Sequence, residues 1–433
     1  MSSKNLANIK IVKTIKILVI LAILFLHNVS VSQTPIYLNI VSHNESTDPL
    51  DYDGTFVDYQ SMKGFVKELC DTIISKRAKY NMQVDANFIF GCLHFDNAAN
   101  NPIDLLEWAN NSPYIDVDGH NHFNPSLGPG YNPYNYADLA YLLDSCGVEL
   151  KRKILGGATY ITTASFNEQW TQYSGPVTGY TFSDFIWQAE ILWGSGTPGH
   201  VADYNVFGIW KPKGATALTF SVHDPNETLT FIGGGCKDAI GFNIVPQTGL
   251  LRHTTDEVIQ NIKDLSDFIQ TLPPSENDFY TLNMLMNFRD LPNIPNVADS
   301  VARIIDGLQP YADNGKIIWA TLAEKYDRWY SAHLNPDDHF IYDCEDVVLS
   351  TDWDPSGERI TLYPNPAKEY LMIDLNEEKK TRIYILDMTG RAVYQQDFLG
   401  RVITIPVNGF HEDLYFIRVQ TDKSISIKKF VKQ

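Results

Sequence analysis

Histidines accompanied by acidic residues stand at the predicted ends of several strands in the central part of the chain. They are His43, His94, His120 with His122, and His223, and each of these four places has an acidic residue within two positions. Imidazole and carboxylate groups act as metal ligands and as general acids and bases. The pattern indicates hydrolytic chemistry, and it makes His223 a candidate acid, base or substrate-binding residue.

The strongest pattern lies in residues 114–122, where Asp116, Asp118, His120 and His122 are spaced two apart. Side chains alternate along a strand, so all four share one face. Two acids and two imidazoles are costly to bury unless a cation binds them. This ligand set suits zinc, and also iron, manganese or cobalt. We therefore expect a divalent metal, such as zinc, at the end of this strand.

His43 and Glu45, also two apart, follow the first predicted strand and can complete the metal shell. The predicted ligands are His43, Asp118, His120 and His122. A bound metal lowers the pKa of its water to about 7 and polarises a carbonyl, which is the chemistry of a metal-dependent hydrolase.

Other interpretations use the same residues differently. A histidine–aspartate network at the surface needs no metal. A metal-free glycosidase needs a pair of carboxylates at strand ends, and Glu45 with Asp118 or Glu190 could form it. A third possibility is a non-catalytic surface protein that binds glycans.

Residues 160–213 are rich in aromatic side chains and glycine, with few charges. The aromatic residues are Trp170, Tyr173, Tyr180, Trp187, Trp193, Tyr204 and Trp210. Such rings could stack on sugars in a cleft, or they could form a hydrophobic layer over the rest of the fold. Both interpretations are open from the sequence.

The elements that must position these residues alternate between strand-like and helix-like segments. Strands are predicted at 36–41, 84–92, 114–122, 153–157, 217–223 and 316–320, and helices at 62–80, 101–110, 136–146, 256–271, 298–312 and 322–331. Repeated βα units predict an α/β fold, a (β/α) barrel-like catalytic domain over residues 33–350. In such barrels the reactive side chains lie at the carboxyl ends of the strands.

Both ends of the chain carry different signals. Four lysines precede the apolar run ILVILAILFL at 17–26, and Ser30 and Ser32 follow, which predicts a signal peptide over residues 1–32. Ten apolar residues are too few to span a bilayer, so no integral membrane span is expected after cleavage. Residues 351–357 read as a linker, and the short alternating runs of 358–433 predict a small all-β sandwich.

The last segment contains LYPNPAKEYLMIDL, IYILDMTGRAVYQ and LYFIRVQTDKSISIKKFVKQ. These motifs resemble the C-terminal sorting domain of the type IX secretion system, although Asp413 replaces a glycine that the family usually has. The resemblance implies export through the periplasm, the type IX machinery as a partner, and a secreted or cell-surface location.

The order of parts in residues 35–331 resembles the polysaccharide deacetylase superfamily. Polar groups end the first strand, a histidine pair ends the third, and IIWATLAEKYDRW closes the region. The chain departs from the family in having His43 and Glu45 instead of paired aspartates, and histidines two rather than four apart. The resemblance implies a polysaccharide substrate, His120 and His122 as ligands, and Asp51 or Glu45 as the catalytic base.

Charge and cysteine content exclude some classes of protein. The formal net charge is −18, and acids outnumber bases in residues 33–356. So acidic a surface repels phosphate backbones, so nucleic acid is not an expected partner. The five cysteines are widely spaced and form no CxxC pair, which speaks against a disulfide scaffold or a thiolate zinc site.

Overall fold

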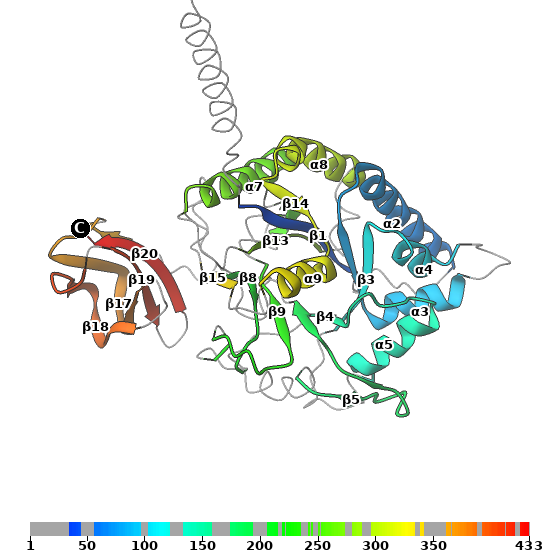
Figure 1. Ribbon diagram of the computed structural model, residues 1–433, viewed down its shortest axis with the longest axis horizontal. Helices are drawn as coiled ribbons and strands as arrows, with labels where there is room; N and C mark the ends of the chain where they lie inside the picture. Colours follow the sequence, from blue (N-terminus) through cyan, green and yellow to red (C-terminus); the bar gives the residue numbers. More distant parts are fainter. Residues whose placement is uncertain are drawn as a thin grey trace, which may run out of the picture. The chain divides into compact units, whose positions relative to one another are not determined.

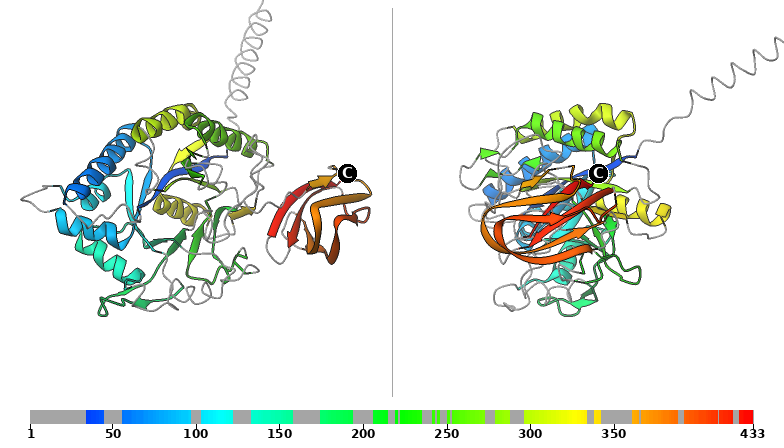
Figure 2. Two further views of the ribbon diagram at one scale, coloured as in Figure 1. Left: turned by 180° about the vertical axis from the view of Figure 1, so that it is seen from behind. Right: turned by 90° about the vertical axis from the view of Figure 1, so that its left-hand side faces the viewer.

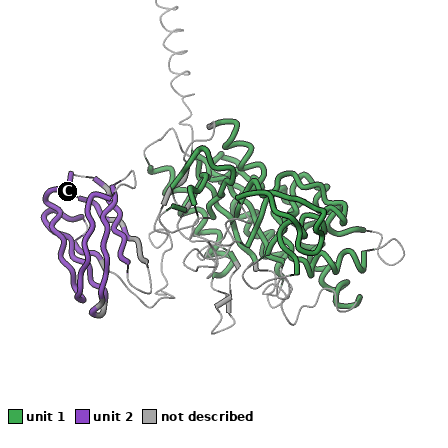
Figure 3. Tube along the Cα trace, turned by 90° about the horizontal axis from the view of Figure 1, so that it is seen from below, with its two compact units in different colours: residues 1–340 green, residues 341–433 purple. Residues whose placement is uncertain are grey.

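The computed structural model separates into two compact units, residues 1–340 and 341–433 (Figure 3). It describes residues 34–44, 56–96, 103–121, 133–157, 174–193, 206–214, 219–220, 222–234, 241–242, 244–245, 250–251, 253–272, 279–287, 296–333, 338–341, 361–364, 366–387, 392–411, 413–420 and 425–432. The predicted signal peptide and the predicted linker 351–357 lie outside these ranges. None of the described helices is long and apolar enough to cross a membrane.

One eleven-stranded sheet forms the first unit, in the order β10-β13-β1-β2-β3-β4-β7-β9-β8-β15, with β14 also paired to β1. The strands are β1 (Ile36–Asn44), β2 (Tyr80–Val84), β3 (Ile115–His120), β4 (Ile154–Gly156), β7 (Ile191–Trp193), β8 (Val206–Trp210), β9 (Thr230–Ile232), β10 (Gly241–Phe242), β13 (Tyr280–Asn287), β14 (Ile317–Trp319) and β15 (Asp338–Ile341). All pairs from β10 to β9 are parallel, and β8 runs antiparallel to β9. Two short hairpins accompany the sheet, β5 (Val177–Thr178) with β6 (Ile186–Trp187) and β11 (Ile244–Val245) with β12 (Leu250–Leu251).

Helices form an arc around about half of this curved sheet (Figure 1). They are α2 (Phe56–Lys76), α3 (Ala86–Phe95), α4 (Leu105–Asn110), α5 (Tyr136–Ser145), α7 (Thr255–Ile269) and α8 (Val297–Asp313). Their buried apolar faces, such as Val66 and Leu69 of α2 and Ile304 of α8, cover the helix side of the sheet. The expected α/β, barrel-like architecture is confirmed.

Among the described residues, no backbone ladder joins β13 to the β8–β9 pair. Instead, the Thr281 hydroxyl accepts a hydrogen bond from the Gly208 N–H and donates one to the Gly233 carbonyl, both at 2.8 Å. Asn283 Nδ2 donates to the same Gly233 carbonyl at 3.1 Å. Side chains of β13 therefore join the two borders of the sheet around a lumen.

Helix α9 (Leu322–His333) lies inside the ring of strands (Figures 1 and 2). Its Leu322, Ala323 and Trp329 pack in one apolar cluster with lumen-facing residues of the strands, among them Val41, Ile154, Ile191, Ile209 and Leu285.

Charged residues of α9 show which end of the lumen the helix covers. Glu324 pairs with Lys79, just before β2, and Asp327 pairs with Arg152, just before β4, both at 2.6 Å. Lys79 and Arg152 both precede their strands, so the two ion pairs lie at the amino-terminal ends of these strands. Helix α9 therefore covers the amino-terminal end of the lumen. The carboxyl-terminal end is the one left for a site.

Two expected strands are wrong. The described residues of 217–223 form a turn, a bend and, at His223, an isolated bridge, and the next strand is β9. Residues 84–92 do not form a strand, because β2 ends at Val84 and α3 begins at Ala86. Asp85 caps the helix by accepting the Phe88 N–H at 2.8 Å. The apolar run of this segment suggested a strand because Phe88, Ile89 and Cys92 are all buried on the inner side of α3. His94 therefore lies exposed at the end of a helix rather than at the end of a strand.

The second unit is an antiparallel sheet with its own apolar core. Its strands are β16 (Thr361–Tyr363), β17 (Tyr370–Leu386), β18 (Ala392–Pro406), β19 (Asp413–Gln420) and β20 (Ile425–Lys432). Two long strands, β17 and β18, replace four short ones expected from the sequence, and their register shifts between Asp374 and Lys379. The expected all-β class is confirmed, and the polar run before Lys379 forms an irregularity within a strand instead of a turn.

Candidate functional site at the carboxyl end of the barrel strands

Two predicted metal ligands meet at the carboxyl end of the parallel strands. The ring centroids of His43 on β1 and His120 on β3 lie 4.0 Å apart, with the planes tilted by 35°. The Trp193 ring meets His43 edge-on at 5.3 Å. All three side chains are buried. The structure thus brings together His43 and His120, which are far apart in sequence, against an aromatic wall.

The register of the parallel strands places these residues on two adjacent levels. His43 pairs with Gln83 on β2, and Gln83 pairs with Asp118 on β3. His120, two residues further along β3, pairs with Gly156 on β4, which pairs with Trp193 on β7. The cluster of His43, Gln83, His120, Gly156 and Trp193 is called the mouth cluster below.

Three other predicted site residues, Glu45, Asp51 and His122, lie outside the described residues. Glu45 follows β1 directly after Asn44, and His122 follows His120 by two residues. Their sequence positions keep both as candidates for the same site, and their roles stay predictions.

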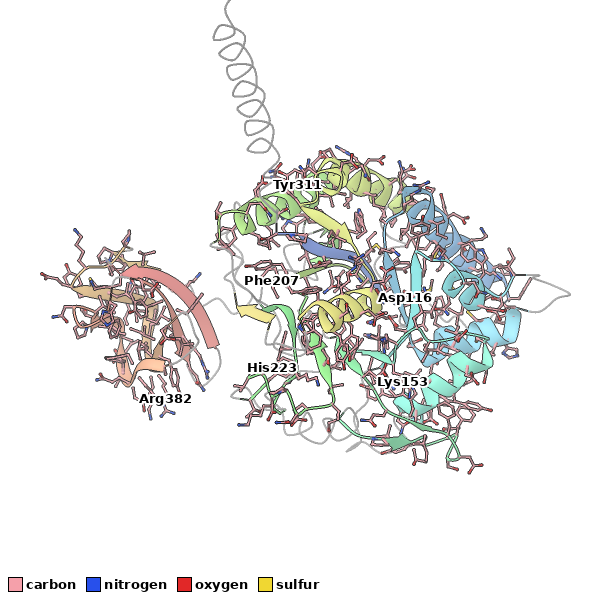
Figure 4. All side chains as sticks on the ribbon, viewed as in Figure 1. Asp116, Lys153, Phe207, His223, Tyr311 and Arg382 are labelled. Carbon is pink, nitrogen blue, oxygen red and sulfur yellow. The ribbon has the colours of Figure 1, made fainter. Side chains whose placement is uncertain are left out.

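The fourth, His223, is not brought to the mouth cluster. It forms an isolated antiparallel bridge with Pro212, and its Nδ1 accepts the Lys211 N–H at 3.1 Å. Lys211 follows β8, which runs antiparallel to β9, so this bridge lies toward the amino-terminal ends of the parallel strands. Figure 4 shows His223 and Asp116 in separate parts of the unit.

Asp116, Asp118 and His120 share one face of β3, as the spacing predicts, but each has a different partner. Asp116 pairs with Lys151 at 2.6 Å. Asp118 accepts a hydrogen bond from Asn81 Nδ2 at 2.7 Å. Only His120 faces the other imidazole. Protein groups therefore interact with both buried acids of this strand. The burial of Asp118 alone does not require a bound metal.

Asn81 belongs to a chain of buried amides that crosses the lumen. Its Oδ1 accepts the Leu322 N–H at 3.0 Å, which fixes the amide so that Nδ2 points to Asp118. The same Oδ1 accepts from Asn39 Nδ2 at 2.8 Å. Both amides therefore point their N–H groups toward the carboxylate.

The chain ends on Lys325 of α9, which is fully buried. Its ammonium group contacts three acceptors: Asn39 Oδ1 at 2.7 Å, Asn283 Oδ1 at 2.8 Å and the Leu282 carbonyl at 2.9 Å. The Asn283 amide is oriented by its bond to the Gly233 carbonyl. Three acceptors need three N–H groups, and only the charged form of lysine has them. Residues Asp118, Asn81, Asn39 and Lys325 are called the lumen relay below.

Burial affects both charged ends of the lumen relay. Burial, and then the charge of Asp116, raises the pKa of Asp118 to about 8. Burial lowers the pKa of Lys325 well below its ordinary value. The hydrogen-bond pattern opposes this second effect, because the amide dipoles run from the ammonium group to the carboxylate and stabilise both charges. We therefore assign Lys325 as charged.

A metal would need more ligands than the mouth cluster supplies. Among the described residues, no three His, Cys, Asp or Glu side chains come together to hold an ion. Catalytic zinc commonly has three protein ligands, of which His43 and His120 could provide two. The fit therefore depends on His122 or Glu45, and Asp118 is directed instead to Asn81.

The carboxylate pair of the glycosidase interpretation is not supported at Glu190. This residue precedes β7, and its Oε2 accepts the Lys153 N–H, just before β4, at 3.1 Å. Glu190 therefore lies at the amino-terminal end of the strands, whereas Glu45 follows the carboxyl end of β1.

The described tryptophans of residues 160–213 are core residues. Trp187, Trp193 and Trp210 are buried, and Trp210 Nε1 donates to the Phe220 carbonyl at 2.7 Å. Tyr180 is 38% exposed, and Trp170, Tyr173 and Tyr204 lie outside the described residues. For the three tryptophans, the hydrophobic-layer interpretation is the one that fits.

The sequence patterns did not identify Gln83 or Lys325 as candidate site residues. Lys325 had a signal, because it stands between Leu322 and Trp329 on the apolar stripe of α9. A lysine on the apolar stripe of a helix is unusual, because most lysines lie at the protein surface. Gln83 had none, since a lone glutamine in a strand marks no chemistry.

Comparison with known proteins identifies the second unit. Residues 361–433 match the family described as the secretion system C-terminal sorting domain. The chain is therefore exported by the type IX system to the cell surface or the medium. No curated protein matches the sequence.

Solved structures give further likenesses. PorZ, a type-IX secretion component of Porphyromonas gingivalis, is 20% identical over 17% of this chain and 11% of its own, with a TM-score of 0.16. The chain thus spans about a tenth of that protein. A glycoside hydrolase/deacetylase of Parabacteroides distasonis is 8% identical over 86% of both chains, with a TM-score of 0.38. A 4-alpha-glucanotransferase of Thermococcus litoralis is 10% identical over 68% of this chain and 40% of its own, with a TM-score of 0.39.

Proposed function

We propose that the first unit is an exported hydrolase that removes acyl groups from glycans, with His43 and His120 at the centre of its active site. One observation carries the proposal: two buried imidazoles lie 4.0 Å apart at the carboxyl ends of parallel barrel strands. That end is where barrel enzymes place their chemistry. Helix α9 covers the opposite end of the lumen, which leaves the end with these two rings for a substrate to enter.

The reaction joins a water oxygen to the acyl carbon and breaks the bond from that carbon to the sugar nitrogen or oxygen. One imidazole accepts the proton of the water and returns it to the departing amine or alcohol. Proton transfer by a positioned histidine contributes on the order of 10²–10⁴-fold to such rates.

A divalent metal is part of the proposal, with His43 and His120 as ligands and His122 or Glu45 completing the shell. When bound, it would supply Lewis-acid polarisation of the carbonyl. Glu45 or Asp51 remains the proposed base in this form of the mechanism. Asp118 is left out of the shell because its carboxylate belongs to the lumen relay.

A glycan substrate is supported by surface aromatic rings near the mouth cluster. Tyr141, which is 37% exposed, stacks on Phe182 with centroids 4.1 Å apart, and Tyr134 lies 6.4 Å from the same ring. The Tyr134 carbonyl accepts a hydrogen bond from Asn121, the residue after His120. Partly exposed aromatic faces of this kind can pack on sugar rings, and the acidic net charge disfavours phosphorylated polymers.

The test measures deacylation of acetylated glycans and metal content together. We expect His120→Gln to lower kcat at least 100-fold and to reduce bound metal. His411→Gln, an exposed change in the second unit, is the matched control and should alter neither quantity. EDTA should abolish activity, and added zinc or another divalent ion should restore it.

Other outcomes replace parts of the proposal. Activity that is lost in His120→Gln but is unaffected by EDTA would support a hydrolase that works without a metal. Glycan binding without turnover, with any metal added, would replace the hydrolase by a surface glycan-binding protein.

A further inference from the structure

Gln83 is the carboxamide of the mouth cluster. Its side chain is fully buried, and within the described part of the chain neither Oε1 nor Nε2 has a hydrogen-bond partner. The other lumen amides, Asn39, Asn81 and Asn283, all have partners. Buried carboxamides without partners are rare and destabilising, and they are retained mainly where they serve a function.

The position of the Gln83 amide is defined by a glycine on a different strand. A Cβ atom at Gly156 would lie 2.1 Å from Gln83 Oε1 and 2.9 Å from Nε2. The glutamine therefore reaches from β2 across β3 to β4, and it can hold this position only because residue 156 has no side chain.

The same amide lies among the histidines of the proposed active site. Gln83 is in register with His43, and Gly156 is in register with His120. Its donor and acceptor thus face the part of the lumen where the two imidazoles meet.

We propose that the Gln83 carboxamide binds the hydrolytic water and orients it toward the group that accepts its proton. This inference rests on the proposed function. A carboxamide can accept a hydrogen bond from a water and donate one to it, and it stays neutral at every physiological pH. A fully buried amide suits a ligand of the size of water better than a sugar ring. Gln83 is thus a binding residue. The proton moves from the water to an imidazole in the metal-free form of the reaction, and to Glu45 or Asp51 in the metal-bound form.

The test replaces the amide by an apolar side chain of similar length. Gln83→Met keeps the length and the burial of the side chain, so the variant should fold with the circular dichroism spectrum of the wild type. It should also lower kcat at least tenfold, with KM changed less than twofold. The matched control is Gln309→Met on the exposed side of α8, which should leave kcat unchanged.

Two outcomes overturn the inference. An unchanged kcat in Gln83→Met excludes Gln83 from the reaction, and a rise in KM that accounts for the whole loss of kcat/KM makes it a substrate-binding residue instead. Gly156→Ala gives independent evidence, because it displaces Gln83 without changing it. Its loss of stability should be smaller in a Gln83→Ala background, where nothing blocks the added methyl group.

Failure of the proposed function can be separated from failure of this inference. If the protein cleaves no glycan, a high-resolution crystal structure of the whole chain still decides the second point. A water bonded to both the Gln83 amide and an imidazole supports it, and an amide bonded to a protein atom contradicts it.

Discussion

The lumen relay and the mouth cluster differ in how their buried polar groups are satisfied. The relay is a continuous hydrogen-bonded chain that runs from Lys325, on the helix that covers the amino-terminal end, through the two asparagines to Asp118, which is level with Gln83. At the mouth cluster, the Gln83 amide is buried without a partner among the described residues. The hydrogen bonds of the lumen relay hold its side chains in place. A buried amide without a protein partner in the described part of the chain, such as that of Gln83, is suited to a site that binds a ligand.

The sequence pattern of β3 predicts that its acids and imidazoles share one cation at the mouth, and the structure differs from this prediction. In the structure the compensating cations of the acids are lysines, Lys151 for Asp116 and, through two amides, Lys325 for Asp118. Only His120 of the described residues on this face remains for chemistry.

The largest expected effect comes from Lys325→Met, which leaves Asp118 buried without its distant counter-charge. Removing one partner of a buried charge pair costs about 3–5 kcal/mol. We expect a loss of unfolding free energy of that size in denaturant titrations at pH 9. A loss below about 1 kcal/mol would show that the lumen relay does not couple the two charges.

The same variant should be sensitive to pH. Burial raises the pKa of Asp118 to about 8, above its unfolded value near 4. A carboxyl with a raised folded pKa stabilises the fold most at low pH, and that contribution is lost as the pH rises through the folded value. The penalty of Lys325→Met should therefore grow between pH 6 and pH 9. Adding Asp118→Asn should remove this growth.

A smaller loss is expected from Asn81→Leu, which interrupts the lumen relay but keeps both charges. The Leu322 N–H and Asn39 Nδ2 would each lose an acceptor. Leaving buried donors unsatisfied costs about 1–3 kcal/mol each, and some relaxation should keep the total near 2–4 kcal/mol. Thermal unfolding followed by circular dichroism measures it. Unchanged stability would argue that the amides only fill space.

The smallest effect should follow Lys151→Met, which breaks the pair with Asp116 at the rim of the sheet. Lys151 is 39% exposed, so solvent already screens the charge and can reach the acid once the lysine is gone. We expect a loss of about 1 kcal/mol or less. A loss as large as that of Lys325→Met would erase the distinction between rim and lumen.

Local patterns predicted the local features of this protein well. The period of two in residues 115–120 indicated the shared polar face of β3, and the terminal motifs identified the sorting domain. Patterning failed where two periods compete, as in α3, whose Phe88, Ile89 and Cys92 read as a strand.

Contacts between distant segments could not be predicted. Lys325 reaches Asn39 across 286 positions, and no spacing rule connects them. The meeting of His43 with His120 could be guessed from barrel geometry. The register that places Gln83 on the strand between theirs, and Gly156 beside His120 on the next strand, had to come from the fold.

The first strand of the unit is shared between neighbours from opposite ends of the sequence. The amino half of β1 pairs with β14, its carboxyl half pairs with β2, and the segment after β14 is the helix that closes the lumen. The barrel thus depends for its completion on residues 317–333, and β15 (Asp338–Ile341) adds the last described strand of the same sheet. Any proteolytic maturation that removes the sorting domain must therefore cut beyond residue 341, or the sheet would lose a strand and, with a cut before α9, the helix that covers one end of the lumen.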